Sequence, residues 1–533
     1  MQHAVQSMIE ARQIAYQFPG EVTPLFSGID MFLNAEQHAL VGRNGIGKSW
    51  LASVLAQQIS PTEGSVKHFC DVGYLSQSLS SFAGNAADML GLSKIMRANE
   101  RVLAGIGNTD DFDMMEGKWD WQYQVESLLA EGELNPNILN RPFDSLSGGE
   151  QTRIRLLTLK KQGVGFMILD EPSNHLDRQG RLWLVRWLAA FNGGVLLVTH
   201  NTQLLQHTSI VYELSGLGLS RSIGGWETWL ESKEQLRLGI QREVEQTQKN
   251  LKQVLQDKQK DYEKVSKRLS QGKQRRENAN QAKLLLDRER DRSGATLSRQ
   301  AKLHEERVQR HTSLATDART KLEIIDPLSI TVATPQTATP PLLYLQDVIL
   351  PFGSNIPISL TIHNNERLAV IGNNGSGKST LLKVMTGVLP LKQGTCRITP
   401  SYRLMDQHFS FLDKNQSALH NFQLQSPGWT EDRYRTRLAQ LRIRGEEALK
   451  PVGYLSGGEQ LKVALACLFC GPYAPALLLL DEPDNHLDIE SRELLQKALH
   501  DYTGAMVLIS HDEQFIQNVG NMQKLALTSK SLY

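Results

Sequence analysis

Two short stretches of the sequence combine the residue types that bind the phosphates of a nucleotide. "GRNGIGKSW" spans Gly42–Trp50 and "GNNGSGKST" spans Gly372–Thr380. In each, glycines let successive backbone N–H groups turn toward phosphate oxygens, the lysine holds the β- and γ-phosphates, and the serine hydroxyl ligates Mg²⁺. The predicted nucleotide-binding residues are Gly42, Arg43, Asn44, Gly45, Ile46, Gly47, Lys48, Ser49 and Trp50, and Gly372, Asn373, Asn374, Gly375, Ser376, Gly377, Lys378, Ser379 and Thr380.

Acidic pairs downstream of each loop supply the remaining chemistry. The apolar runs "FMILDE" and "LLLLDE" both end in an aspartate followed by a glutamate. The aspartate of such a pair lies near Mg²⁺, and the glutamate orients and polarises the attacking water. A histidine that ends a further strand reaches the γ-phosphate, and a glutamine suits a metal and water contact. The predicted catalytic residues are Glu171, Glu482, His200, His511, Gln77 and Gln407, and the predicted metal ligands are Ser49, Asp170, Gln77, Ser379, Asp481 and Gln407.

The spacing of these residues reveals an internal repeat. Lys48 precedes Gln77 by 29 residues, and Lys378 precedes its glutamine by the same interval. The interval from catalytic glutamate to histidine is also 29 residues in both copies. Each copy alternates strand-like and helical runs, so we predict two α/β domains with largely parallel sheets that gather the chemistry at the carboxyl ends of their strands. The predicted domains span residues 1–228 and 342–533, with residues 229–341 between them.

The segment between the copies has a different composition. Residues 237–323 carry 22 Lys and Arg against 13 Asp and Glu, although the whole chain has a net charge of only +1. Apolar residues at alternating three- and four-residue intervals predict an antiparallel helical hairpin with its tip near Ser270–Gly294, and "TVATPQTATPP" predicts an extended linker after it. Such a hairpin either neutralises RNA phosphates or is a solvated hairpin without a partner. The candidate RNA-binding residues at the tip are Lys273, Arg275, Arg276 and Lys283.

Composition excludes several other classes of protein. The chain is 40% apolar and 22% charged, and no run of about 18 apolar residues is present, so we expect a cytoplasmic protein without its own membrane passage. The four cysteines lack the pattern of a secreted scaffold. Cys467 and Cys470 form a CxxC with no second pair to complete a metal site, which predicts buried thiols.

A second repeated motif narrows the fold and the activity. "LSGGEQ" occurs at Leu146–Gln151 and at Leu455–Gln460, and resembles the signature of ATP-binding-cassette ATPases; "DEPSNHLD" and "DEPDNHLD" resemble their acidic motif with its D-loop. The resemblance implies an ATPase that forms ADP and phosphate, in which two cassettes of one monomer stack head to tail. Each ATP, with Mg²⁺, then lies between the phosphate loop of one cassette and the signature of the other. The implied residues are Ser147, Gly148, Gly149, Ser456, Gly457 and Gly458 for the signatures, Asp177 and Asp488 for the D-loops, and Tyr16 or Phe18 and Phe352 for adenine stacking.

This pairing defines two composite sites. The first ATP site combines Lys48 with Ser456, and the second ATP site combines Lys378 with Ser147. Tandem cassettes joined by a basic helical hairpin resemble the ABC-F group. That resemblance implies a partner, the ribosome with its large-subunit rRNA and tRNA, and a role in stall relief, energy-dependent gating of translation or protection from antibiotics. The alternative is a non-ribosomal cassette ATPase that acts on DNA or couples to a separate membrane transport partner.

Two departures from the family pattern carry further expectations. Trp50 stands where a hydroxyl commonly touches the α-phosphate, as Thr380 does in the other loop, so we expect a working but weaker or slower first ATP site. The stretch between Gln77 and Ser147 is 21 residues longer than its counterpart in the second copy and is acidic around "TDDFDMMEGKWDW". It predicts only a rudimentary arm, poorly suited to RNA.

Overall fold

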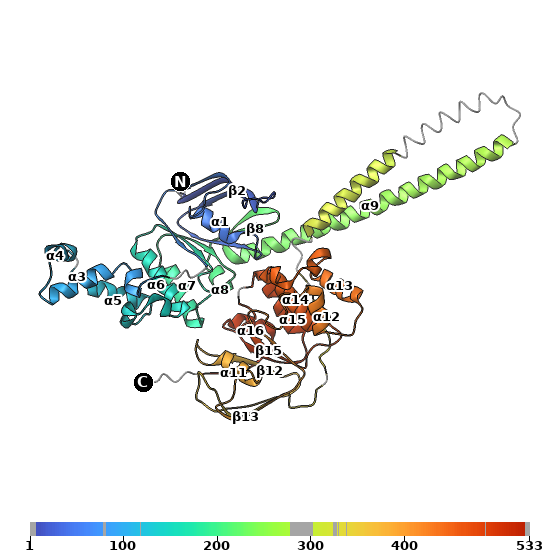
Figure 1. Cartoon of the computed structure of the whole chain (residues 1–533). Coiled ribbons are helices and arrows are strands. Elements are labelled where there is room, and N and C mark those ends of the chain that lie inside the picture. Colours follow the sequence, from blue (N-terminus) through green and yellow to red (C-terminus); the bar gives the residue numbers. More distant parts are fainter. Residues whose placement is uncertain are drawn as a thin grey trace. The chain divides into compact units, whose positions relative to one another are not determined.

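A computed structural model describes residues 7–77, 82–117, 119–277, 302–322, 328, 330–336, 338–485 and 487–527 (Figure 1). The chain divides into two compact units. One unit holds both copies of the repeat, in Met1–Trp226 and Leu328–Tyr533, and the other holds Glu227–Pro327. The predicted α/β architecture with a helical segment between two copies is confirmed.

A mostly parallel six-stranded sheet forms the centre of the first copy. Its order is β5 (Val72–Leu75), β6 (Phe166–Asp170), β7 (Gly194–Val198), β3 (Gln37–Gly42), β8 (Ile210–Ser215) and β9 (Gly218–Ile223), with only the β8–β9 pair antiparallel. Every residue of β6 and β7 is buried, because helices cover both faces of a parallel sheet and leave no strand face in water. Parallel β6 and β7 therefore end side by side, which brings the acidic pair near the histidine that follows β7.

A smaller antiparallel sheet and the helices complete the first copy. The sheet has the order β2 (Phe26–Leu33), β1 (Ile9–Tyr16) and β4 (Glu63–His68). The helices are α1 (Lys48–Leu55), α2 (Ala86–Met89), α3 (Ser93–Leu103), α4 (Thr109–Met115), α5 (Trp121–Glu131), α6 (Gly148–Lys161), α7 (Arg178–Ala189) and α8 (Thr202–Leu205), with short 3-10 turns at Pro136–Asn140 and Phe143–Ser145.

The second copy repeats this plan. Its parallel sheet has the order β14 (Tyr402–Met405), β15 (Leu477–Asp481), β16 (Ala505–Ile509), β12 (Arg367–Ile371) and β17 (Gln523–Ala526), and its antiparallel sheet the order β11 (Ile358–Ile362), β10 (Leu343–Ile349) and β13 (Gln393–Ile398). The helices are α11 (Lys378–Met385), α12 (Ala418–Gln425), α13 (Glu431–Gln440), α14 (Gly457–Phe469), α15 (Ile489–Asp501) and α16 (Glu513–Val519). Two 3-10 turns, Gly445–Leu449 and Val452–Tyr454, precede α14.

The extra length of the first copy lies between β5 and α6. Four α-helices, α2 to α5, occupy this interval, whereas α12 and α13 alone occupy the matching interval of the second copy. Among them, α3 and α4 pack on each other, and Arg101 pairs with the buried carboxylate of Asp111. The arm is therefore a compact helical insertion. Its exposed side chains include Phe112, Trp119 and Tyr123.

The second unit is an antiparallel helical pair. Helix α9 (Gly225–Glu277) is followed, after residues 278–301, which lie outside the described residues, by a helix at residues 302–322 (Figure 1). Asp261 lies 3.4 Å from His304, and Glu243 lies 3.6 Å from Lys321, so the contacts advance along one helix as they retreat along the other. This confirms the predicted hairpin. Lys283 lies outside the described residues, and Lys273, Arg275 and Arg276 lie on α9 at positions whose side chains are not described.

The predicted linker packs on the second copy. The backbone N–H of Ala333 donates to the carbonyl oxygen of Phe469 (2.7 Å), and that of Gln336 donates to Ala474 (2.8 Å). Beneath it, Cys467 and Cys470 are free and buried in the core of this copy, as the lone CxxC predicted.

Candidate active sites

The two glycine-rich loops have the conformation that their sequence predicts. Each leaves the end of a parallel strand and enters a helix through a glycine in the left-handed region, Gly47 (φ 104°) before α1 and Gly377 (φ 98°) before α11. Gly42 also has a positive φ, and a Cβ at this position would collide with the carbonyl oxygen of Leu214. Only glycine satisfies both requirements. Each loop therefore leads into the N-terminus of a helix, where free backbone N–H groups bind anions.

Each loop lysine folds back over its own loop. The ammonium of Lys48 donates to the carbonyl oxygens of Gly42 (2.8 Å) and Arg43 (2.9 Å), and Lys378 makes the equivalent bonds at 2.9 and 3.1 Å. Burial lowers the pKa of Lys48 to about 8, and burial also lowers the pKa of Lys378. Burial disfavours the charged form of both lysines because it removes water. A bound phosphate stabilises the charged form, because it places a negative charge beside each ammonium group.

The serine after each lysine faces the aspartate that ends the neighbouring strand. The hydroxyl of Ser379 donates to Asp481 Oδ1 (3.1 Å), and Ser49 occupies the equivalent position beside Asp170. Burial raises the pKa of both carboxyl groups, and within the described part of the chain Asp170 Oδ1 has no hydrogen-bond partner. A hard divalent cation prefers such carboxylate and hydroxyl oxygens. These oxygen atoms fit Mg²⁺.

Glu482 is held by three neighbours. Its carboxylate accepts hydrogen bonds from Gln407 Nε2 (2.8 Å) and Asn485 Nδ2 (2.5 Å), and His511 Nε2 lies 3.2 Å away. Burial alone raises its pKa, but the contact with His511, the charge of Lys378 and the bond from Asn485 outweigh burial, and the pKa is below its ordinary value. The second copy therefore holds its glutamate as a carboxylate, the form that accepts a proton from water.

Glu171 occupies the equivalent position with fewer contacts. Thr199 Oγ1 lies 3.4 Å from its carboxylate and His200 Nε2 lies 3.8 Å away. Within the described residues Gln77 donates no bond to it, unlike its counterpart Gln407. Burial raises the pKa of Glu171 to about 8, against the opposing charge of Lys48, and burial lowers the pKa of His200 to about 3. The two sites thus share their residue types and differ in their electrostatics.

The backbone at the two glutamates is the same. Glu171 and Glu482 both have φ of 49°, in the left-handed region that is costly for a side chain with a Cβ. The sharp turn lets each residue leave a buried strand and direct its carboxylate toward the following histidine. This strain recurs in both copies and lies where the chemistry is expected.

The signature serines begin helices. Ser147 and Ser456 are the N-caps of α6 and α14, and each forms a reciprocal capping box with the glutamate three residues later. The Ser147 hydroxyl donates to Glu150 Oε2 (2.7 Å) and accepts from the Glu150 N–H (3.3 Å). A helix N-terminus with an exposed serine and two following glycines presents N–H donors to an anion.

The two copies meet at the phosphate loop of the first. The backbone N–H of Asn44 donates to Asp488 Oδ2 (2.8 Å), and Arg43 pairs with Glu490 at 2.5 Å. Asp488 is the residue that the family resemblance implied as a D-loop aspartate. Arg43 and Glu490 form a salt bridge that the motif alone did not reveal. The sequence shows only that Arg43 and Glu490 are charged, and nothing in it indicates that they meet.

Strand register identifies the aromatic residue that each copy places at the loop. Gln13 in β1 and Asp347 in β10 both have positive φ and mark the same irregularity in pairing with the neighbouring strands. Phe18 and Phe352 lie five residues beyond these positions. They are therefore equivalent, and Phe18 is the counterpart of Phe352 among the two aromatics that the sequence left open.

Trp50 packs against this aromatic residue. Its indole stacks on Tyr16 with centroids 5.1 Å apart and an interplanar angle of 22°, and meets Phe18 edge-on at 4.9 Å. In the second copy Thr380 replaces the indole, and Phe352 is 68% exposed, with no ring contact to any described residue. In the first copy three aromatic side chains therefore pack together, whereas the corresponding phenylalanine of the second copy is exposed.

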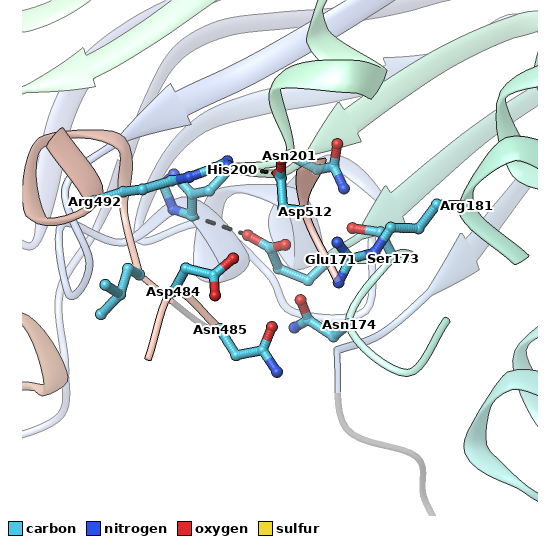
Figure 2. Close-up of a pocket in the computed structure, with 11 residues that line it drawn as sticks. Glu171, Ser173, Asn174, Arg181, His200, Asn201, Asp484, Asn485, Arg492 and Asp512 are labelled. Carbon is cyan, nitrogen blue, oxygen red and sulfur yellow. Dashed lines mark hydrogen bonds and ion pairs between the residues drawn. The ribbon is translucent and has the colours of Figure 1, made fainter. Parts of the chain in front are cut away.

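A polar cavity of about 50 Å³ lies between the two copies (Figure 2). Side chains from both copies line it and face one another across it. The charged and titratable residues among them are Glu171, Arg181 and His200 from the first copy and Asp484, Arg492 and Asp512 from the second.

Comparison with known proteins identifies the family. The family model described as ABC transporter matches residues 28–174 and 356–485. The chain is 30% identical to the ATP-binding protein YdiF of Bacillus subtilis, over 91% of this chain and 75% of that protein. It is 28% identical to human ATP-binding cassette sub-family F member 3, over 93% of this chain and 68% of that protein. The chain belongs to the ABC-F family of ATP-binding-cassette proteins. The two copies of this ABC-F protein are therefore cassettes that bind ATP.

Solved structures share the fold of this ABC-F protein. The RNase-L inhibitor matches with a TM-score of 0.57 at 17% identity, over 96% of this chain and 86% of that one. An archaeal ribosome recycling factor, aABCE1, in complex with the ribosomal stalk protein aP1, matches with a TM-score of 0.53 at 17% identity, over 96% and 87%. At this identity the likeness concerns the arrangement of the chain. None of the helices in the described part of this ABC-F protein is long and apolar enough to cross a membrane.

Proposed function

We propose that this ABC-F protein hydrolyses ATP at two composite sites and uses the cycle to bind and leave the ribosome, modulating translation by stall relief, energy-dependent gating or protection from antibiotics. The observation that carries the composite sites is the hydrogen bond from Asn44, in the phosphate loop of one cassette, to Asp488 of the other. Such a contact places a phosphate of ATP in reach of both cassettes. Binding of ATP then draws the cassettes together, and hydrolysis releases them.

The side chains of each site divide the reaction among them. Lys48 and Lys378 bind the phosphates, and the signature serines contact the γ-phosphate from the opposite cassette. Ser49 and Asp170, and likewise Ser379 and Asp481, would hold Mg²⁺, which would neutralise the charge that develops on the phosphates. Glu171 and Glu482 orient the attacking water and accept its proton, so each must be a carboxylate when hydrolysis begins.

The ribosome is the partner that the helical pair supports best. Residues 237–323 have an excess of nine positive charges, in a chain whose remaining residues are acidic on balance. Neutralising RNA phosphates with such a surface releases counterions, so binding weakens as salt rises. Two proteins with similar structures are an archaeal ribosome recycling factor in complex with a ribosomal stalk protein and ribosome-bound ABCE1, which agrees with this partner.

Co-sedimentation with ribosomes tests the proposal. A Glu171→Gln, Glu482→Gln chain binds ATP without hydrolysing it, and we expect it to travel with ribosomes when ATP is present. The matched control, a Lys48→Ala, Lys378→Ala chain, binds little ATP and is expected to remain in the supernatant. Failure of the folded Glu→Gln chain to associate with ribosomes in ATP refutes the ribosomal role and leaves the non-ribosomal ATPase.

The same assay isolates the hairpin. Deleting residues 270–294 removes the basic tip and leaves both cassettes intact. We expect ATP binding to be retained and the ATP-dependent association with ribosomes to fall. Unchanged association would show that the tip contributes no binding energy.

A further inference from the structure

The cavity between the cassettes is lined by charges that the two copies do not share equally (Figure 2). Glu482 follows Glu171 by 311 positions, as His511 follows His200. At the same offset Arg181 corresponds to Arg492, so each cassette contributes one arginine. The acids differ. The second cassette contributes Asp484 and Asp512, and their counterparts in the first cassette are Ser173 and Asn201.

The arginine of the second cassette already has an acid of its own. Arg492 donates to Asp512 Oδ2 at 2.5 Å, and both side chains are buried. Asn201 cannot offer the same charge to Arg181. Within the described residues Arg181 Nε has no hydrogen-bond partner, and no ion pair joins Arg181 to a carboxylate of its own cassette. The charges of the two arginines and two aspartates cancel. Arg181 has a carboxylate partner, however, only if it pairs with the aspartate of the other cassette.

Asp484 is the acid in position to do so. One carboxylate oxygen accepts a hydrogen bond from Ser510 Oγ (3.0 Å), and the other, Oδ1, is buried without a partner among the described residues. Burial raises the pKa of Asp484, and the charges of Arg492 and Arg181 oppose that rise. A buried carboxylate with a free oxygen is costly unless a cation approaches it.

The cavity borders Glu171 and His200 of the first ATP site, and the chain neighbours of Arg181 and Asp484 link both residues to the second ATP site as well. Asp484 lies two residues after Glu482, and Arg181 lies one helical turn after Asp177 on α7. The charge of Asp177 in turn acts on Lys378. Arg181 and Asp484 therefore connect the D-loop of one cassette to the catalytic glutamate of the other.

We propose that Arg181 and Asp484 form an ion pair across the cassette interface when ATP is bound, and that this pair positions Glu482 at the second ATP site. The inference rests on the proposed function, since it concerns hydrolysis at a composite site. Its equivalent at the first ATP site is absent, because Arg492 is paired with Asp512 and the counterpart of Asp484 is the uncharged Ser173. Arg181 and Asp484 are positioning residues, and the coupling they provide acts mainly on the second site.

A double-mutant cycle in two backgrounds tests this coupling. In a Glu171→Gln chain only the second site turns over, and there Arg181→Gln and Asp484→Asn are each expected to lower kcat about fivefold and to raise KM, because a pair that forms when ATP is bound also strengthens ATP binding. The double substitution is expected to lower kcat no more than either single one, because each single substitution already removes the whole ion pair. In a Glu482→Gln chain, where only the first site turns over, the same substitutions are expected to lower kcat far less. Additive losses, or equal losses in both backgrounds, overturn the proposal.

A binding experiment separates this inference from the proposed function. In the Glu171→Gln, Glu482→Gln chain, affinity for a fluorescent ATP analogue is measured without turnover for the same four members of the cycle. We expect the two single substitutions to weaken binding and their effects to be non-additive. Absence of ATPase activity in the unmodified chain would refute the proposed function alone, whereas additive or absent effects on binding would refute the ion pair alone.

Discussion

Replacing Trp50 by threonine is expected to lower the stability of the first cassette and to raise its affinity for ATP. The indole stacks on Tyr16 at 5.1 Å and meets Phe18 at 4.9 Å, and each aromatic contact of this kind contributes about 0.5–1.5 kcal/mol. Losing both contacts should lower the free energy of unfolding by roughly 1–3 kcal/mol. The new hydroxyl should add a hydrogen bond to a charged phosphate, worth about 1.5–3 kcal/mol, or roughly ten- to a hundredfold in affinity.

Affinity at the first ATP site is measured in a chain that carries Lys378→Ala, which silences the second site, and Glu171→Gln, which prevents turnover. Titration calorimetry with ATP and Mg²⁺ then compares Trp50 with Trp50→Thr. Urea unfolding of the same two chains gives the stability term. Equal affinity in the two chains would refute the reasoning and leave the indole as a packing residue only.

The reciprocal substitution is the matched control. Thr380→Trp places an indole in the second cassette, where Leu350 stands in place of Tyr16 and Phe352 is exposed. We expect ATP affinity at the second site to fall, without the gain in stability that an aromatic stack would give. A stability gain equal to the loss in Trp50→Thr would contradict the role assigned to Tyr16.

Three further outcomes follow from the geometry. In the Glu482→Gln chain kcat/KM, which reports the free enzyme, should pass through a maximum at about pH 8, because Glu171 must lose its proton while Lys48 keeps its own, and the pKa of each is about 8. In the Glu171→Gln chain kcat/KM should not rise from pH 7 to 8, since the pKa of Glu482 is below its ordinary value, and superimposable profiles would contradict the asymmetry. Asp488→Ala removes the bond from Asn44 and the cap of α15, so calorimetry should show a loss of about 1 kcal/mol and ATPase assays a larger loss at the first site than at the second. Leu479→Ala, at a fully buried position of β15, should cost about 2–5 kcal/mol in urea unfolding, and a loss below about 1 kcal/mol would contradict the packing.

The features that depend on neighbouring residues in the chain were predicted from the sequence. The glycine loops, the strands that end in acidic pairs and the matched spacing of the two copies all depend on short-range backbone preferences and on burial. The helical pair followed from apolar periodicity, and Asp261 and Glu243 find partners on the returning helix as an antiparallel hairpin requires. These features were readable without knowing which parts of the chain meet.

Contacts between distant residues were not readable in this way. The pairing of Arg43 with Glu490 joins positions more than 400 residues apart, and neither residue carries a motif that names the other. The different pKa values of Glu171 and Glu482 arise from neighbours rather than from the glutamates, whose flanking sequences are nearly alike. The stacking of Trp50 on Tyr16 likewise depends on how β1 approaches α1.

The most direct test of the account is a crystal structure of the Glu171→Gln, Glu482→Gln chain with ATP and Mg²⁺. The account predicts one γ-phosphate within hydrogen-bond distance of both Lys48 and Ser456, and the other within that distance of both Lys378 and Ser147. Nucleotides bound to the phosphate loops alone, with both signature serines out of contact, would contradict the composite sites on which the proposed function depends.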